Sequence, residues 1–326
     1  MENIREPEKI IACAREAGFN ALMTGAAPEE LEPFARLARK AGIDTYATIA
    51  ATATSPELAQ VMSPEEEEVL RNLAADKEPR KRAYQWGGEP AAVREGKPET
   101  TEVLRSRVLC FHRPEACELL RKRIRDTLES CPSVAGVAFD FFGYQNYRSC
   151  ECPVSQGQFE AWRRSHPNLS PDKAKVQFSQ ETLVAFSNDI SAYVRSLRPN
   201  IKLATHVYPV FLPDPLYGNR LDVDYCCQTV AWFFEPYWPE EKVARYTRIV
   251  VGDGAKHQPK ARGIPFIGLY VRKPFADKPV EQFAAELNYV FAAASDTSLS
   301  VCAFNALVDY PQYRDAFLRA AARQAR

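Results

Sequence analysis

Amphipathic helical segments alternate with short apolar runs along the chain. Apolar residues at helical spacing predict helices over 6–17 and 28–42, and a glycine stands where the C-terminal cap of each is expected. A run rich in apolar and β-branched residues follows each helix, at 20–26 and 44–50, and predicts a strand. This order of helix and strand is typical of an α/β protein with a parallel sheet.

The same alternation resumes after residue 107 and continues to the end of the chain. Helices are expected at 113–131, 156–164, 171–198, 239–252, 279–295 and 309–324. Strands are expected at 133–144, 201–211, 226–235, 264–271 and 298–307. The run at 133–144 is almost continuously apolar, which is typical of a strand buried on both faces.

Seven expected strands, with a helix at each end of the series, predict a fold class. It is α/β, a (β/α)8 TIM-type barrel that lacks its first strand or has been trimmed of it. An open doubly wound sheet is the alternative. We favour the barrel because the 14 glycines form no GxGxxG or GxxxxGK pattern of the kind that cradles phosphates. One catalytic domain over residues 1–326 is expected.

Residues 52–107 interrupt the alternation with charge runs, prolines and a glycine pair. We expect an inserted loop region there, partly helical near 64–75. A solvated insertion is the simpler interpretation, although Trp86 beside Gly87 and Gly88 would suit the tip of a substrate-facing loop.

Composition narrows the classes of partner. The 42 basic and 42 acidic side chains give a net charge of zero, which argues against nucleic acid or a polybasic membrane contact. No apolar run reaches the roughly 18 to 20 residues of a membrane helix, and the first residues show no signal-peptide pattern. The 9 cysteines favour reduced thiols and a cytoplasmic setting, unless the N-terminus has been trimmed. A homo-oligomer is left open.

Two acidic residues stand near the ends of expected strands, where barrels carry their active sites. Asp140 lies within AGVAFDFFGY, where an unpaired acid is costly, so it is expected to serve chemistry or to pair with a partner. Glu235 lies among aromatic residues, and an apolar enclosure raises a carboxyl pKa as a general acid requires. A helix cap or a solvated loop position is the alternative for Glu235. Two such carboxylates among aromatic rings are typical of glycoside hydrolysis.

Further polar and aromatic residues near the strand ends are candidate substrate contacts. They are His112, Arg113, Tyr144, His206, Tyr208, Trp232, Tyr270, Arg272 and Asn305. The two histidines would contact sugar hydroxyls or pair with Asp140, since no HxH or HExxH spacing favours a metal. Arg272 would hold an anionic substrate group or pair with a site acid. Cys150 and Cys152 lack the second cysteine pair that a zinc site normally has, so no metal and no cofactor are expected.

The stretch from Val108 to Phe159 resembles a known family. Its order, FHRPEACELLRKRIRDTL and then SVAGVAFDFFGYQNYRSCECPVSQGQFEAW, is similar to that of the hypothetical glycosyl-hydrolase group of TIM barrels. In that group a strand ends in DGxxxD and a Cys-x-Cys-Pro-x-Cys segment follows. The resemblance implies a catalytic nucleophile at the end of the fourth strand, at Asp140, and an acid/base on or after the sixth, at Glu235.

The chain departs from that pattern in three places. Ala135 stands where the family often has Asp, Ser155 replaces the third cysteine, and the first barrel strand is missing ahead of Asn3. The change at Ser155 weakens the case for a structural metal.

The sequence therefore predicts a glycoside hydrolase with Asp140 as nucleophile and Glu235 as general acid/base, acting on an oligosaccharide or glycoside. One alternative is a noncatalytic carbohydrate-binding barrel. Another is a metal-dependent barrel isomerase or lyase that takes His112 and His206 among its ligands. Fold alone cannot decide between them, because this architecture hosts many reactions.

Overall fold

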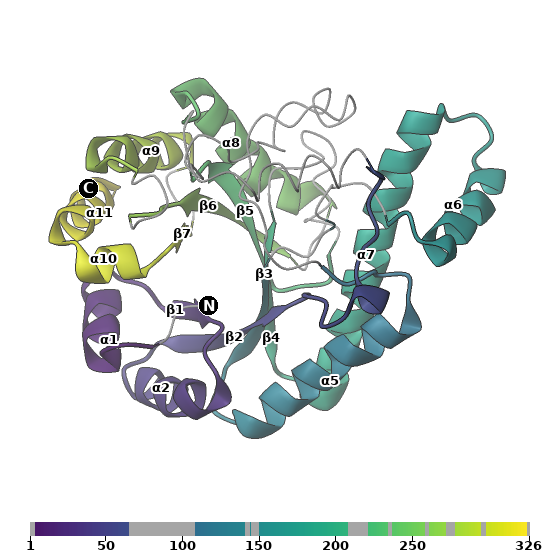
Figure 1. Ribbon diagram of the computed structural model, residues 1–326. Coiled ribbons are helices and arrows are strands. Elements are labelled where there is room, and N and C mark those ends of the chain that lie inside the picture. The colour runs from purple at the N-terminus through teal and green to yellow at the C-terminus, as the bar shows by residue number, and fades with distance from the viewer. Residues whose placement is uncertain are drawn as a thin grey trace.

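The computed structural model describes residues 4–64, 108–140, 144, 150–207, 221–233, 237–257, 261–271, 278–294 and 298–324. Within them, seven parallel strands pair in the order of the sequence and curl into a half-barrel with helices on its outer side (Figure 1). The strands are β1 Ala21–Thr24, β2 Asp44–Ala50, β3 Gly136–Asp140, β4 Lys202–Val207, β5 Tyr225–Ala231, β6 Arg262–Gly268 and β7 Ser300–Cys302. The expected parallel α/β architecture is confirmed. The alternative of a doubly wound sheet is wrong, because such a sheet reverses its strand order partway.

The helices, labelled as in Figure 1, are α1 Pro7–Glu16, α2 Pro28–Lys40, α5 Pro114–Ser130, α6 Pro153–Ser165, α7 Pro171–Leu197, α8 Glu240–His257, α9 Val280–Ala293, α10 Asn305–Asp309 and α11 Pro311–Gln324, with a short 3₁₀ helix η1 at Pro56–Leu58. Most of these α-helices begin at a proline, which loses no hydrogen bond there and has the helical φ angle already set. Gly18 and Gly42 follow α1 and α2 at φ 76° and 77°, as expected of C-terminal caps. No helix in the described ranges is both long and apolar enough to span a bilayer.

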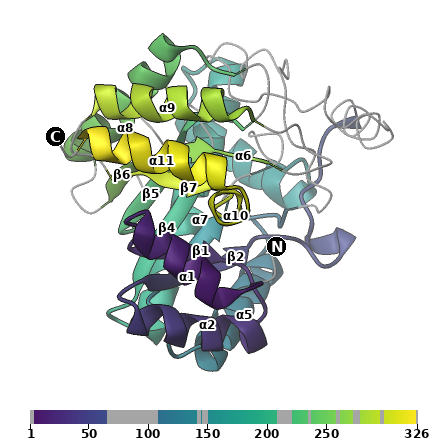
Figure 2. The same cartoon turned by 90° about the vertical axis from the view of Figure 1, so that its left-hand side faces the viewer.

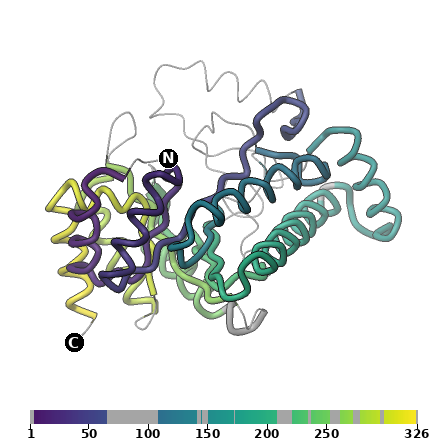
Figure 3. Tube along the Cα trace, turned by 90° about the horizontal axis from the view of Figure 1, so that it is seen from below, coloured from purple at the N-terminus to yellow at the C-terminus, as the bar shows by residue number. Residues whose placement is uncertain are grey.

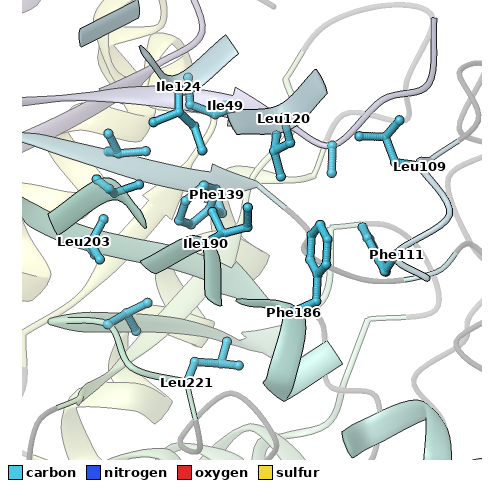
Figure 4. Close-up of a cluster of buried hydrophobic side chains, with 14 of the residues drawn as sticks. Ile49, Leu109, Phe111, Leu120, Ile124, Phe139, Phe186, Ile190, Leu203 and Leu221 are labelled. Atoms are coloured by element: carbon cyan, nitrogen blue, oxygen red, sulfur yellow. The ribbon is translucent and has the colours of Figure 1, made fainter. Parts of the chain in front are cut away.

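Alternation along β3 sends its side chains to two different environments. Phe139 points outward and packs with Ile49 of β2 against Leu120 and Ile124 of α5, both fully buried (Figure 4). Asp140, next along the strand, points to the inner side of the half-barrel. Burial of the outer face thus fixes the strand register and, with it, the side on which the acid lies.

The inner side is closely filled at the N-terminal end of the strands. Tyr46 of β2 packs there with Ala138 of β3 and Ala204 of β4. A Cβ atom on Gly136 would collide with the Tyr46 ring and lie 2.7 Å from the carbonyl oxygen of Lys202. Glycine at 136 therefore allows the Tyr46 ring to fill the N-terminal end of the half-barrel. The C-terminal ends of the strands are then the place where an active site can form.

β1 and β7 flank the open side of the half-barrel, and each pairs with one strand of the sheet. The helices outside them meet: α1 contacts α10, with α11 alongside (Figure 2). The Cys13 thiol donates to the carbonyl oxygen of Leu307 at 3.6 Å, and the rings of Phe19 and Phe317 stack at 4.9 Å. The outer layer of helices is therefore continuous across the gap between β1 and β7, although these two strands do not pair.

The two ends of the insertion expected at 52–107 lie next to each other. The Leu109 amide donates to Ala51, and the Gln60 amide donates to Val108, so the two ends of this region are tied together. The helix expected near 64–75, and Trp86, lie outside the described residues. Beside this point, α6 and the beginning of α7 project away from the half-barrel (Figure 3), whereas the later part of α7 packs in the core through Phe186, Ile190 and Val194.

One expected strand is wrong over half its length. The run at 298–307 was expected to be extended throughout, but β7 ends at Cys302 and α10 begins at Asn305. The Ala306 amide donates to Ala303 in a tight turn that starts this helix. Short apolar runs fit a strand and a buried helix equally well, so the pattern alone could not separate them.

Candidate functional site

Asp140 and His206 form the centre of the candidate site. Asp140 ends β3 and lies opposite His206 of β4 in the pairing register. His206 Nδ1 and Asp140 Oδ1 are 3.0 Å apart, and the Asp140 side chain is 62% exposed whereas that of His206 is 10% exposed. The structure thus supplies the expected partner for the acid. The carboxylate faces solvent, and a largely buried imidazole holds it in place.

The His206 ring is itself held on two further sides. Its Nε2 lies 3.0 Å from the hydroxyl oxygen of buried Thr229 on β5, and its plane stacks on Phe266 of β6 at 3.9 Å. With Nδ1 donating to the carboxylate, the Thr229 hydroxyl is placed to donate to a neutral Nε2 or to accept from a protonated one. A chain of contacts from four successive strands therefore orients Asp140.

Opposing influences set the pKa of the Asp140 carboxyl. Desolvation by the surrounding protein is the largest and raises the pKa, but the hydrogen bond from His206 and its positive charge together outweigh it. The net result is a pKa below the usual range of an aspartate. Asp140 is therefore an ionised carboxylate near neutral pH, which suits a nucleophile or base and not a proton donor.

Aromatic rings pack against one side of this centre. The ring of Phe233 lies 6.3 Å from that of His206, 5.7 Å from Phe266 and 5.3 Å from Tyr270. We call Phe233, Phe266 and Tyr270 the aromatic wall. Phe233 fits here because Gly268 of β6 has no side chain: a Cβ at that position would lie 2.6 and 2.7 Å from two atoms of the Phe233 ring.

Replacing Gly268 by Ala is expected to displace Phe233 and loosen the aromatic wall. Overpacking of this kind costs about 1–3 kcal/mol of unfolding free energy, measured by denaturant titration. Gly157→Ala in α6 is the matched control, because no atom lies within 4 Å of its Cβ position. It should be neutral or slightly stabilising, as alanine is the better helix former. Equal stabilities of the two variants would contradict the close approach of Phe233 to β6.

Three buried thiols form a second cluster, within the core that also holds Phe139 on the outer face of β3. They are Cys110, Cys150 and Cys152, and we call them the thiol cluster. Their sulfur atoms all lie within 4.8 Å of one another, and those of Cys110 and Cys152 are 3.7 Å apart. Ligands about 2.3 Å from a tetrahedral zinc ion are about 3.8 Å from each other, so this spacing suits a thiophilic cation.

Several predicted substrate contacts belong to the thiol cluster and not to the Asp140 centre. His112 Nδ1 lies 2.8 Å from the Ser155 hydroxyl, and its Nε2 lies 3.1 Å from that of Thr182. Tyr144, fully buried, has its hydroxyl 3.4 Å from His112 Nδ1. Arg113 is beside the same thiols: burial is the largest influence on the pKa of its guanidinium and lowers it, but Cys152, Cys110 and Cys150 together raise it by more. The buried Tyr144 ring offers a substrate no surface here.

Hydrogen bonds couple the groups of the thiol cluster. A hydrogen bond between the Cys110 and Cys150 thiols lowers the pKa of Cys110 and raises that of Cys150, so Cys110 ionises more readily than Cys150. The Ser155 hydroxyl lies 3.4 Å from the sulfur atom of Cys110 and 3.3 Å from that of Cys152. Within the described ranges these three cysteines are the group that could hold a metal. His112 and His206 are not brought together as ligands with Asp140.

We expect the purified protein to bind about one Zn²⁺ per chain at the thiol cluster, because three sulfur ligands are already assembled. Cys110→Ser should remove most of this zinc and lower the thermal unfolding temperature. Cys117→Ser, on α5 and outside the cluster, is the matched control. It should have the zinc content and the unfolding temperature of the wild type. Elemental analysis after dialysis against zinc measures the content, and equal zinc in the two variants would rule this binding site out.

The remaining predicted residues have different outcomes. Glu235, Tyr208 and Arg272 lie outside the described residues. Trp232, directly after β5, is 3% exposed, which leaves its ring little surface for a substrate. Tyr270 belongs to the aromatic wall, and Asn305 is the first residue of α10.

Sequence reasoning missed four residues of these two clusters. Thr229, Phe233 and Phe266 look like ordinary strand residues, and nothing in their local pattern distinguishes an inner position beside a histidine. Cys110 is 40 or more residues before the Cys-x-Cys segment and completes the thiol cluster only through the fold. Its one local signal is its place in VLCFHRP, next to a candidate histidine.

Comparisons with known proteins give a fold-level likeness. No family model and no curated protein matches the chain. Among solved structures, a β-galactosidase from the haloarchaeon Halorubrum lacusprofundi matches at TM-score 0.60 and 14% identity, over 98% of this chain and 56% of that one. A β-galactosidase from Rahnella sp. R3 matches at 0.55 and 13%, over 98% and 53%.

A catalytic mutant of a GH42 β-galactosidase from G. stearothermophilus is similar at TM-score 0.54 and 12% identity, over 98% of this chain and 54% of that one. The chain therefore spans about half the length of the solved structures that it matches. Identity this low carries the fold and not the activity. The chain has a glycosyl-hydrolase-like α/β fold.

Proposed function

We propose that the protein is a glycoside hydrolase in which Asp140 is the nucleophile and Glu235 the general acid/base. The observation that carries this proposal is the exposed, ionised Asp140 carboxylate held by His206 at the C-terminal end of β3. Its support from outside the chain is the fold shared with β-galactosidases. An oligosaccharide or glycoside is the substrate class that a carboxylate pair beside aromatic rings suits.

The strand numbering agrees with this assignment. If the half-barrel is a (β/α)8 barrel without its first strand, β3 and β5 hold its fourth and sixth positions. Asp140 ends β3, and Glu235 follows β5 by four residues in the sequence. The two carboxylates would then project from the same end of the barrel, where its loops gather.

The chemistry assigns opposite protonation states to the two acids. The Asp140 carboxylate attacks the anomeric carbon while Glu235 protonates the departing glycosidic oxygen, and a glycosyl-enzyme ester forms. Glu235, now ionised, takes a proton from water, and the water oxygen attacks the anomeric carbon and releases Asp140. Configuration at that carbon is retained, and the anomer of the first product, followed by NMR, reports it.

His206 has a defined electrostatic role in this scheme. Its hydrogen bond and charge lower the pKa of Asp140. Activity that depends on the ionised carboxylate is therefore fully present above the ordinary aspartate pKa of about 3.9. This activity is lost as the pH falls through the lowered pKa of the folded protein. His206→Leu removes both influences and leaves desolvation, so the acidic limb of kcat/KM should move to higher pH. His206→Gln, which keeps an amide donor, should move it less. An unmoved limb in both variants would show that Asp140 does not set it.

The experiment that tests the proposed function is a screen of the wild type against aryl glycosides and natural oligosaccharides, with and without a brief chelator treatment. Release of sugar that is insensitive to chelator is expected. No release at any pH, with saturable sugar binding, would replace the proposal with a noncatalytic carbohydrate-binding barrel. Activity lost on chelation and restored by a divalent cation alone would favour metal-dependent chemistry instead.

A further inference from the structure

Thr229 of β5 is a fully buried residue whose hydroxyl serves another side chain. The hydroxyl oxygen lies 3.0 Å from His206 Nε2, which is its hydrogen-bond partner within the described part of the chain. Thr205 of β4 and Thr247 of α8, which are equally buried, instead donate to main-chain carbonyl oxygens at 3.2 and 2.8 Å. The Thr229 hydroxyl is therefore committed to the imidazole that contacts Asp140.

The pairing of the strands brings this hydroxyl to the ring. His206 lies opposite Cys227 in the pairing of β4 with β5, and Thr229 is the next residue of β5 on the same face. Directly after Thr229 the pairing of β5 with β6 shifts, so that Val230 is an extra residue in a β-bulge. Bulges bend a strand, re-aim its side chains and are frequent next to active sites. The regular ladder thus ends at the residue that contacts His206.

The His206 ring has two orientations that fill the same space. A half-turn about the bond between Cβ and Cγ exchanges each ring nitrogen with a carbon atom but keeps the plane of the ring. The stack on Phe266 at 3.9 Å is therefore the same in both orientations. In one of the two, Nδ1 faces Asp140 and Nε2 faces Thr229. Hydrogen bonds, and not packing, must then select the orientation in which the histidine supports the carboxylate.

The two hydrogen bonds that make this selection have different surroundings. The Asp140 side chain is 62% exposed, so water competes for its oxygen atoms. Thr229 is 0% exposed and the His206 side chain is 10% exposed, so breaking the bond between them would take a partner from two buried polar groups. Such a loss is costly in the core, whereas an exposed group bonds to water instead. The bond from Thr229 is therefore the stronger constraint on the ring.

We propose that Thr229 is a positioning residue, whose hydroxyl holds His206 in the orientation that directs Nδ1–H at Asp140. The inference rests on the proposed function, in which Asp140 is the nucleophile. A hydroxyl both donates and accepts, so its bond to Nε2 persists whether or not this nitrogen is protonated. The proton of a neutral imidazole then stays on Nδ1, because the contact of one ring nitrogen sets the state of the other.

The glycosyl-enzyme ester is the stage at which this constraint matters most. The Asp140 carboxylate loses its charge when it forms the ester, and its attraction for the His206 ring weakens. Thr229 is not involved in the ester, so its bond keeps the ring in place. Nδ1–H is then already directed at Asp140 when water attacks and the carboxylate re-forms.

Thr229→Val tests the inference by removing the hydroxyl and keeping the shape of the side chain. We expect kcat/KM to fall on the order of 10-fold, less than the roughly 10²-fold that a misplacement of about 1 Å can cost. Its acidic limb should move to higher pH, by less than in His206→Leu, because the bond that lowers the pKa of Asp140 is then formed only part of the time. Burial raises the pKa of neighbouring Cys227 to about 11, so this thiol does not affect the limb. Thr229→Ser, which keeps a hydroxyl, should restore most of the wild-type value.

NMR of the ring nitrogens gives a readout that does not depend on activity. The signals of His206, identified among the 4 histidines by their loss in His206→Gln, should show a protonated Nδ1 throughout the pH range of the kinetic profile. In Thr229→Val the proton should be shared between Nδ1 and Nε2. Thr247→Val, which also removes a fully buried threonine hydroxyl, is the matched control and should have wild-type spectra and kinetics.

The possible outcomes separate this inference from the proposed function. A changed His206 spectrum in Thr229→Val, together with a wild type inactive on every glycoside, would uphold the hold of Thr229 on the ring and defeat the glycosidase proposal. An unchanged spectrum would overturn the inference, and so would wild-type kinetics of Thr229→Val in an active enzyme. If Thr229→Val does not fold, Thr229→Ala, which also lacks the hydroxyl, is measured in its place with the same expected results.

Discussion

Replacing Asp140 by Asn is expected to lower kcat/KM on the order of 10⁴-fold, the scale seen when a nucleophile or its essential partner is removed. The amide is nearly the same size as the carboxylate but carries no negative charge and is a poor nucleophile. Because the Asp140 side chain is 62% exposed, the substitution should leave the folded state intact. Steady-state kinetics on the best substrate of the screen measures the change.

The control for this variant is Asp126→Asn. Asp126 is an exposed carboxylate on α5 that pairs with Lys122, so it tests the loss of one acid far from the candidate site. It should keep wild-type kcat/KM. Sugar binding by Asp140→Asn, measured by calorimetry, should persist, since the partly exposed Tyr270 remains and the amide can still hydrogen-bond a sugar hydroxyl group. Turnover by Asp140→Asn at the wild-type rate would remove the carboxylate from the mechanism.

The second large effect concerns stability. Lys278→Met alone is expected to lower the free energy of unfolding by about 3–5 kcal/mol, because Glu286 would be left in the core without its cation. The loss should be smaller at pH 5 than at pH 8. The pKa of Glu286 is higher in the folded than in the unfolded protein. The free energy of unfolding therefore falls as the pH rises from the unfolded-state pKa to the folded-state pKa of this carboxyl.

Two comparisons separate this cost from a general effect of substitution. Lys278→Met with Glu286→Leu should recover to within about 1 kcal/mol of the wild type or exceed it, because the desolvation penalties of both charges disappear. Lys9→Met at the surface should change stability very little. Urea titration at the two pH values measures all four proteins, and a double variant as unstable as the single one would show that the ion pair itself stabilises the fold.

The spacing of apolar residues predicted the order of helices and strands, because each element buries one face made of residues that are close together in the sequence. The periodicity of Leu120 and Ile124 in α5, and the continuous apolar run of β3, followed directly from their contact with one shared core. Asp140 could be singled out for the same reason, as an acid within that run. The helix at Asn305–Asp309 escaped prediction because a turn set by Ala303 and Ala306 decided it, and apolar spacing over so few residues does not.

The partners of the candidate residues could not be predicted in the same way. His206 and Asp140 are 66 residues apart, and only strand pairing in register sets them opposite each other. His112 was grouped with them from the sequence, yet the fold places it with Ser155 and Thr182 beside the thiol cluster. Closeness in space between distant segments depends on sheet order and curvature, and no local pattern encodes either.

The sequence by itself thus determined the α/β class, the seven strands found in the described part of the chain and the presence of an acid at the end of β3, since periodicity and burial cost are properties of contiguous residues. Tertiary structure alone decided that His206 lowers the pKa of this acid, that Cys110 joins Cys150 and Cys152, and that a buried Lys278 reaches the β5 exit. Each of these depends on distances between side chains that lie far apart in the chain. Packing of the sheet and its helices fixes such distances, and with them the chemistry.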